Sequence, residues 1–224
     1  MILKDISFTY AQENISYDQT ILELAEAGSS EEVLRFWESE TYFVVLGRAS
    51  KAEVDLNMRN ISRDGIEVIR RGSGGGTVLQ GPGCLNYSLV LAYERHHLLK
   101  NIRSSYKFIL QNISASLNKI GIRSKFEGLS DLAVEGRKFS GNAQCRRRRY
   151  LLHHGTILYA FHLDKIERYI NIPHEAPAYR NGRSHKDFLT NIKAGAADIK
   201  KAIASGWIDE FSCVESGGIL FNLP

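Results

Sequence analysis

The stretch RRGSGGGTVLQGPGCLNYSLVL, residues 70–91, decides the fold because it joins a glycine-rich loop to a strand-like run. Residues 74–76 are glycines, which permit positive φ and let a ligand lie directly on backbone N–H groups. Arg70 and Arg71 are charge-assisted donors for a phosphate or a carboxylate. The stretch therefore predicts an anion-binding loop, with a flexible turn as the alternative. It fits neither Walker A nor GxGxxG, because no Gly-Lys-Ser follows and a strand replaces the expected helix.

Hydrophobic periodicity on both sides of this loop predicts strands and helices within one domain. The strands come in hairpins, with helices between the sets, which favours an α+β fold over a parallel βαβ sheet. One predicted hairpin joins residues 77–79 and 85–91 around Gly81-Pro82-Gly83. Further strands are expected at residues 41–46, 66–69, 132–134, 138–144 and 150–159, and helices at residues 14–26, 106–120, 164–170 and 194–208.

The composition is that of a soluble globular protein, with 43% hydrophobic and 24% charged residues in a chain of 224. The net charge of +4 permits an anionic partner without requiring one. The N-terminus lacks the basic start and apolar core of a signal peptide, and no apolar run is long enough to span a membrane. Cys84, Cys145 and Cys213 are far apart, which argues against a disulfide framework or a zinc site. We therefore expect a cytoplasmic protein.

A second motif, GRKFSG at residues 136–141, places a lysine in a strand-like segment. Alternation puts Lys138 and Ser140 on the face opposite Phe139. A lysine held in a cleft could donate to a carboxylate and a phosphate, and stabilise negative charge that develops there. The alternative is a solvated surface lysine. His154 is likewise either a site residue or a paired core histidine, and no metal-ligand spacing surrounds it.

Two basic segments follow this motif. Residues 146–149 are four arginines between two predicted strands, where a hairpin tip is expected. They are either a solvated tip or a steering patch for an acidic protein, and the absence of an aromatic strand face makes a nucleic acid the weakest alternative. Residues 179–189 cluster Arg180, Arg183, His185 and Lys186. They form a charged loop or add a cation to the anion site.

In this order, the motifs resemble lipoate-protein ligase A and the wider family of lipoate and biotin ligases and octanoyltransferases. The resemblance runs from about residue 14 to residue 192. It implies a mixed, mostly antiparallel sheet flanked by helices, of the biotin/lipoate ligase catalytic-domain type. The motifs that carry it are VVLGR at 44–48, RRGSGGGTV at 70–78, NYS at 86–88, SDLAVEGRKFSG at 130–141 and HHGTIL at 153–158.

The resemblance also implies roles for particular residues. Lys138 would be the catalytic lysine, which holds the acyl carbonyl and the α-phosphate in both half-reactions. His154 and Gly155 would line the acyl tunnel, and Asp131 would help to hold Mg²⁺ or the nucleotide. Arg183 would lie in the segment that folds over the adenylate. The acyl-adenylate would be bound by Arg71, Ser73, Gly74, Gly75, Gly76, Thr77, Asp131, His154, Gly155 and Arg183.

The implied reaction joins lipoate or octanoate to ATP, with Mg²⁺, and forms an acyl-adenylate and pyrophosphate. The acyl group then passes to a lysine of a small acidic lipoyl carrier domain, which we also expect to meet the arginines at residues 146–149. Residues 1–224 would form a single catalytic domain. The smaller C-terminal domain of many ligases is expected to be absent, so that an accessory chain completes activation or the protein performs only part of the reaction.

Departures from the ligase pattern keep other functions open. Gln80 and Cys84 stand where the ligases commonly have histidine and an asparagine that faces adenine, and Gly81-Pro82-Gly83 resembles the octanoyltransferases. Those enzymes need no ATP and carry the acyl group on a cysteine. The cysteine positions of two octanoyltransferase classes hold Leu151 and residues 126–128 here, which leaves Cys84 and Cys145 as candidates. Each is otherwise a small buried residue. A non-catalytic binder of lipoyl domains is the third alternative.

Overall fold

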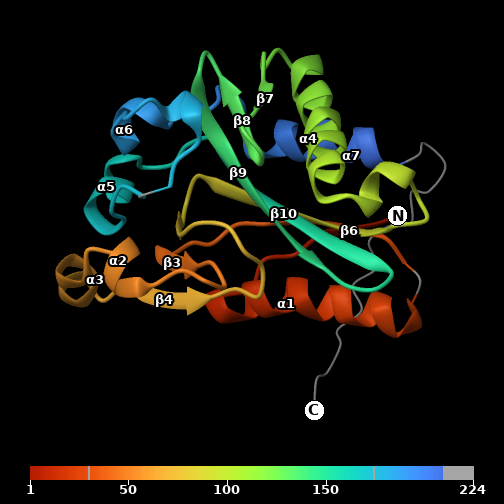
Figure 1. The fold of residues 1–224 in the computed structure, drawn as a ribbon, viewed down its shortest axis with the longest axis horizontal. Coiled ribbons are helices and arrows are strands. Elements are labelled where there is room, and N and C mark those ends of the chain that lie inside the picture. The colour runs from red at the N-terminus through yellow and green to blue at the C-terminus, as the bar shows by residue number, and fades with distance from the viewer. Residues whose placement is uncertain (30, 174, 209–224) are drawn as a thin grey trace.

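The computed structural model describes residues 1–29, 31–173 and 175–208, so Cys213 lies outside the described part of the chain (Figure 1). A seven-stranded sheet has the order β1-β2-β6-β10-β9-β8-β7. Only its β1–β2 pair is parallel. This mostly antiparallel sheet confirms the predicted α+β class. Its strands are β1 (Ile2–Asp5), β2 (Val33–Trp37), β6 (Cys84–Ala92), β7 (Lys125–Glu127), β8 (Asp131–Val134), β9 (Arg137–Arg146) and β10 (Tyr150–Leu158).

A smaller sheet of three strands, in the order β4-β3-β5, lies on the side of the large sheet that α1 occupies (Figure 1). In it β3 (Phe43–Leu46) pairs in parallel with β4 (Glu67–Arg70) and antiparallel with β5 (Val78–Gln80). Its apolar side chains pack with the short helices around it. Those helices are α2 (Ala52–Asp55), α3 (Met58–Asp64), α5 (Asp164–Tyr169) and α6 (His185–Phe188).

The large sheet is covered by helices on both faces (Figure 1). On one face, α4 (Ile102–Lys119) and α7 (Ala196–Trp207) bury their apolar stripes against β6, β9 and β10. The helix α4 begins four residues before the expected position because the Asn101 side chain accepts from the N–H groups of Arg103 and Ser104. On the other face, α1 (Ala11–Leu24) packs Ile21 and Leu22 against β2, β6 and β10. Among the described residues, no helix is both long and apolar enough to cross a membrane.

A buried ion pair fixes α1 to the sheet. Arg35 on β2 is fully buried, and its Nη1 lies 2.7 Å from Oδ1 of Asp18 on α1. The guanidinium also lies near the rings of Tyr17 and Trp37. Burial raises the pKa of Asp18, while Arg35 and the Ser88 hydroxyl oppose this shift. The pair thereby places one carboxylate of α1 in the interior between the two sheets.

The predicted hairpin around Gly81-Pro82-Gly83 was wrong, because β5 and β6 belong to different sheets. The turn carries the chain from the small sheet to the large one. Gly83, at φ +84°, lies against the backbone of residue 160, and a Cβ there would be 2.2 Å from the Ala160 carbonyl carbon. Its carbonyl accepts from the N–H groups of Tyr159 and Ala160. The strands β1, β2 and β7 were not predicted. In β2 the arginine in the middle of the sequence VLRFW interrupts the apolar pattern, although all five residues are buried.

Candidate functional site

A cavity of about 120 Å³ lies between the two sheets and α1. The large sheet contributes side chains from β2, β6, β9 and β10, and the small sheet contributes β3 and β5. The glycine loop, residues 71–76, borders it as well. Of the residues predicted for the site, the cavity is lined by Arg71, Gly75, Gly76, Lys138, His154 and Gly155.

The glycine loop is shaped from inside by Arg71. Its Nη2 donates to the carbonyls of Gly74 at 2.7 Å and Gly76 at 2.8 Å, and its Nε donates to the Ser73 hydroxyl at 2.9 Å. Burial lowers the pKa of this guanidinium to about 10, so it stays charged at neutral pH. Arg71 was predicted as a donor to a bound anion, and in this structure those donors hold the loop.

The backbone of the loop supplies donors for an anion. In the described part of the chain, the N–H groups of Gly74, Gly75 and Gly76 donate no hydrogen bond. Gly75 has φ +83°, and Gly75 and Gly76 are exposed at the cavity. Gly75 also leaves space for Arg71, since a Cβ there would lie 3.1 Å from Nη2. The loop therefore presents bare backbone N–H groups beside a buried positive charge, which suits an anionic oxygen.

His154 joins β10 to this loop. Its Nε2 lies 2.7 Å from the Ser73 hydroxyl oxygen. Burial first, and then the charge of Arg71, lower the pKa of His154 to about 3. The imidazole is consequently neutral at physiological pH. His154 was expected to be either a site residue or a paired core histidine, and the structure makes it a cavity residue with a partner.

The next residue, Gly155, gives room for a polar pair across the strands. It lies opposite Asn142 on β9 and Tyr87 on β6. The Tyr87 hydroxyl donates to Oδ1 of Asn142, and a Cβ on Gly155 would lie 1.8 Å from that same oxygen. All three residues line the cavity. Asn142 and Tyr87 were not predicted as site residues, because their meeting depends on the register of three strands.

Lys138 lies on β9 and its side chain lines the cavity, whereas Phe139 points to the core on the other face, as alternation predicted. Its Nζ lies 2.8 Å from Oδ1 of Asp131. The other carboxylate oxygen accepts a 2.8 Å hydrogen bond from the Tyr179 hydroxyl. Gly141 leaves space beneath the lysine, because a Cβ there would be 2.9 Å from Nζ. The ammonium is therefore held at the cavity by a buried carboxylate.

Three predicted residues have other contacts. Thr77 donates to Oδ2 of Asp55 at 2.5 Å, and Arg183 donates to the carbonyls of Tyr179 and Gly136. Neither lines the cavity. Asp131 was expected to help to hold Mg²⁺ or the nucleotide, and here its two oxygens are paired with the Lys138 ammonium and the Tyr179 hydroxyl. Within the described ranges, no cluster of three or more His, Cys, Asp or Glu could hold a metal.

The two described cysteines lie away from the cavity lining. Cys84 is fully buried, its thiol lies 3.3 Å from the Gln80 side-chain oxygen, and burial raises its pKa well above the usual range. Gln80 in turn pairs with Asn86 through both amide groups. Cys145 is buried with the apolar residues beneath α1. Both cysteines are placed as small core residues, and the raised pKa of the Cys84 thiol makes Cys84 a poor nucleophile.

The four arginines form the tip of the β9–β10 hairpin, as predicted, but they are not equally solvated. Arg146 donates to the Leu99 and Lys100 carbonyls, and Arg149 donates to the Glu26 carbonyl. Arg147, Arg148 and Arg149 are all exposed, but within the described part of the chain the side chains of Arg147 and Arg148 have no hydrogen bond. Only these two are therefore placed to meet a partner without breaking contacts within the chain.

Stability should fall in acid because of His153, which is fully buried in the core beside Tyr87. Burial, with a smaller contribution from His154, lowers its pKa to about 3 from 6.5. The unfolded chain therefore takes up a proton first, so this stabilisation is complete above pH 6.5 and is lost as pH falls towards 3. Relative to His153→Gln, the wild type should lose about 1.4 kcal/mol of unfolding free energy per pH unit in this range. Urea unfolding at several pH values measures it, and parallel curves for the two proteins would contradict it.

The sequence is similar to proteins of one family. The model of the lipoyl protein ligase A/B catalytic domain matches residues 10–205. Probable lipoate-protein ligase A from Mycoplasma pneumoniae is 28% identical over 180 residues, which cover 80% of this chain and 52% of that protein. Octanoyltransferase LipM from Carboxydothermus hydrogenoformans is 29% identical over 222 residues, which cover 89% of this chain and 82% of that protein. The chain thus spans about half the length of the ligase and most of the octanoyltransferase.

The fold is similar to that of solved structures. A bi-partite lipoate protein ligase from Thermoplasma acidophilum, studied with its E2 lipoyl domain, matches with a TM-score of 0.78 at 22% identity, over 91% of this chain and 80% of that one. A lipoate-protein ligase A bound with ATP matches with a TM-score of 0.77 at 21% identity, over 91% of this chain and 82% of that one. At these identities the likeness establishes the architecture alone.

Proposed function

The chain belongs to the lipoyl protein ligase A/B catalytic-domain family, and from this we propose that it is an ATP-dependent acyl ligase for lipoyl carrier domains. Its acid would be lipoate or octanoate, and it would act in the cytoplasm, in keeping with the two cysteines of the described residues, which are both free and buried. The observation that carries the proposal is that Lys138 lines the same cavity as Gly75 and Gly76, whose N–H groups donate no hydrogen bond within the described part of the chain.

In the first half-reaction, a carboxylate oxygen of the acid attacks the α-phosphorus of ATP, and pyrophosphate leaves. In the second, the amine of a carrier lysine attacks the acyl carbonyl, an amide forms, and AMP and a proton leave. Both transition states carry extra negative charge on oxygen. Lys138 and the loop N–H groups are fixed donors that would stabilise that charge, and the protein need not reorganise to supply them.

One observation favours an acyl transferase that needs no ATP, namely the match to most of an octanoyltransferase. That route requires a thiol beside the acyl group, because the acyl chain must be carried as a thioester. Among the described residues, however, no cysteine lines the cavity. The placement of Cys84 and Cys145, the two described cysteines, supports the ligase over the transferase, and the fixed ammonium of Lys138 supports an enzyme over a non-catalytic binder.

The deciding experiment measures the mass of a purified lipoyl domain after incubation with the protein, lipoate and Mg-ATP. We expect a mass increase that requires ATP and survives Cys84→Ala and Cys145→Ala. Acylation from octanoyl acyl carrier protein without ATP, lost in either cysteine variant, would establish the transferase instead. Binding of the domain without any product would leave the non-catalytic role. ATP-dependent acylation by the chain alone would show that it completes both half-reactions without an accessory chain.

The exposed arginines of the hairpin tip should assist the second half-reaction only. Lys138 and the tip lie at opposite ends of β9, about 26 Å apart. A carrier of about 80 residues has a radius of gyration of about 12 Å, so it could lie along the hairpin and reach both ends. We expect Arg147→Ser with Arg148→Ser to raise KM for the carrier about fivefold at low salt, with acyl-adenylate formation unchanged.

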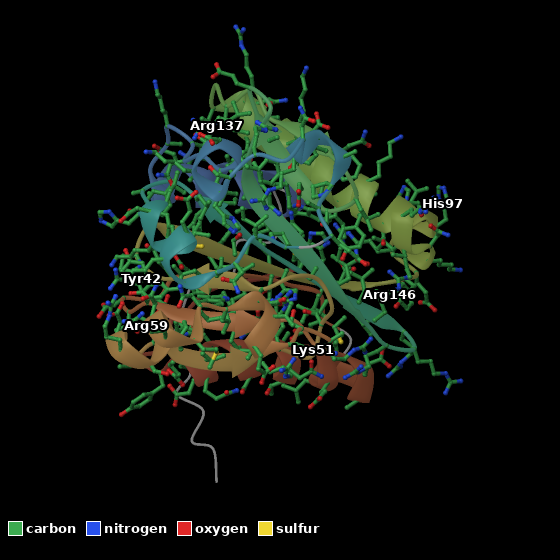
Figure 2. The ribbon with its side chains drawn as sticks, turned by 60° about the vertical axis from the view of Figure 1, so that its left-hand side comes forward. Tyr42, Lys51, Arg59, His97, Arg137 and Arg146 are labelled. Carbon is green, nitrogen blue, oxygen red and sulfur yellow. The ribbon has the colours of Figure 1, made fainter. Side chains whose placement is uncertain are left out.

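The matched control removes two exposed cations elsewhere, Arg59 and Arg123. Figure 2 shows Arg59 on the opposite side of the molecule from Arg146. Substitution of both by serine makes the same change in net charge and should leave KM for the carrier unaltered. If the two double substitutions raised KM for the carrier equally, the cause would be the net charge of the protein and not the position of the arginines at the hairpin tip.

A further inference from the structure

Tyr179 lies behind the lysine of the proposed site. Its hydroxyl donates to Oδ2 of Asp131 at 2.8 Å, while Oδ1 of the same carboxylate lies 2.8 Å from Lys138 Nζ. Asp131 is only 5% exposed, so these two partners take the place of water at its oxygens. Tyr179, Asp131 and Lys138 therefore form a chain of contacts that ends at the cavity.

The segment that carries Tyr179 is also fastened to the backbone around Lys138. The Thr190 N–H donates to the Lys138 carbonyl at 2.9 Å, and Arg183 Nη2 donates to the Gly136 carbonyl at 3.0 Å. The Tyr179 ring packs on Phe188, with 5.1 Å between the ring centroids. The ring of Tyr179 is thus held by packing on Phe188, while its hydroxyl donates to the Asp131 carboxylate.

A lysine ammonium has three N–H donors, and the structure uses one of them on Asp131. The other two remain for an acyl carbonyl and a phosphate oxygen. Without the Tyr179 hydroxyl, Oδ2 of Asp131 would be buried and unpaired, which is costly. The Asp131 carboxylate would relieve that cost by turning both oxygens towards the Lys138 ammonium. Lys138 would then have one N–H donor fewer for the substrate.

We propose that Tyr179 is a positioning residue, which restricts Asp131 to one contact with Lys138 and so leaves two ammonium donors for the substrate. The inference rests on the proposed function of Lys138. It assigns a role in the reaction to a side chain that does not line the cavity.

The kinetic test uses Tyr179→Phe, which keeps the ring and removes the hydroxyl. The kcat of acyl-adenylate formation should fall about tenfold, with KM for lipoate and ATP within about twofold of the wild type. In an Asp131→Ala background, the same substitution should change kcat less than about twofold, because the intermediary is gone. If Tyr179→Phe lowered kcat equally in both backgrounds, or left kcat unchanged in the otherwise wild-type protein, the proposal would be overturned.

The chain offers a matched control. Tyr169 donates to Oδ2 of Asp64 at 3.0 Å, and Arg168 Nη2 lies 2.7 Å from that oxygen. This is the same combination of tyrosine, carboxylate and cation away from the cavity, so Tyr169→Phe should leave kcat unchanged. A similar loss in Tyr169→Phe would mean that the effect is one of general stability, and would overturn the proposal.

A second measurement does not depend on activity. Acetic anhydride labels lysines competitively, and mass spectrometry compares Lys138 with Lys200, whose Nζ lies 2.7 Å from Oδ1 of Asp5. In Tyr179→Phe, labelling of Lys138 relative to Lys200 should fall about threefold, because the carboxylate holds two of its donors. If the wild type forms no acyl-adenylate, the proposed function is wrong, yet this ratio still decides the inference. An unchanged ratio would overturn it.

Discussion

Lys138→Ala is expected to lower the rate of carrier acylation about 10³-fold, which is the upper range for loss of one preorganised donor to a developing oxyanion. The side chain is the one ammonium that lines the cavity among the described residues, and Asp131 holds it at 2.8 Å. The rate is measured from the mass of the carrier domain. Both half-reactions should be affected, so pyrophosphate exchange should fall as well.

The variant should remain folded, because Tyr179 still donates to the Asp131 carboxylate. We expect a loss of about 1–3 kcal/mol of unfolding free energy for the carboxylate oxygen left without its partner. Lys200→Ala removes another lysine paired with an aspartate, at 2.7 Å, and serves as the control. A Lys138→Ala protein with near wild-type activity would show that the chemistry is carried elsewhere.

Gly47→Ala is expected to disable the glycine loop from outside the cavity. A Cβ at Gly47 would lie 2.0 Å from the Gly75 carbonyl oxygen, a backbone atom that cannot move without displacing the loop. Such overpacking costs about 1–3 kcal/mol of stability. Because displacement of reacting groups by about 1 Å can cost about 100-fold in rate, we expect a loss of that size in acyl-adenylate formation.

Gly74→Ala is the matched control within the same loop. A Cβ there would have no heavy atom within 4 Å, and the residue does not need positive φ. Its thermal stability should therefore stay close to that of the wild type. A fall in activity at unchanged stability would place the ligand against Gly74. A stable, fully active Gly47→Ala protein would contradict the close packing of the loop on the end of β3.

The candidate site was predictable where its chemistry is carried by a local pattern. Bare glycines beside arginines indicated an anion-binding loop, and alternation placed Lys138 opposite Phe139. Such local patterns do not predict the hydrogen-bond partner of each polar group. Arg71 was expected to face a ligand and instead donates to its own loop, while Tyr179 came from a segment that suggested only an additional cation.

The sequence by itself determined the α+β class and the two segments that border the cavity, because periodicity and glycine content act over a few neighbouring residues. The tertiary structure decided that β5 and β6 lie in different sheets, and that Tyr87, Asn142 and Gly155 meet across three strands. It also decided which donors remain free at the cavity. Strand order and register bring together residues that are distant in sequence, and those contacts determine which polar groups are already paired before any ligand arrives.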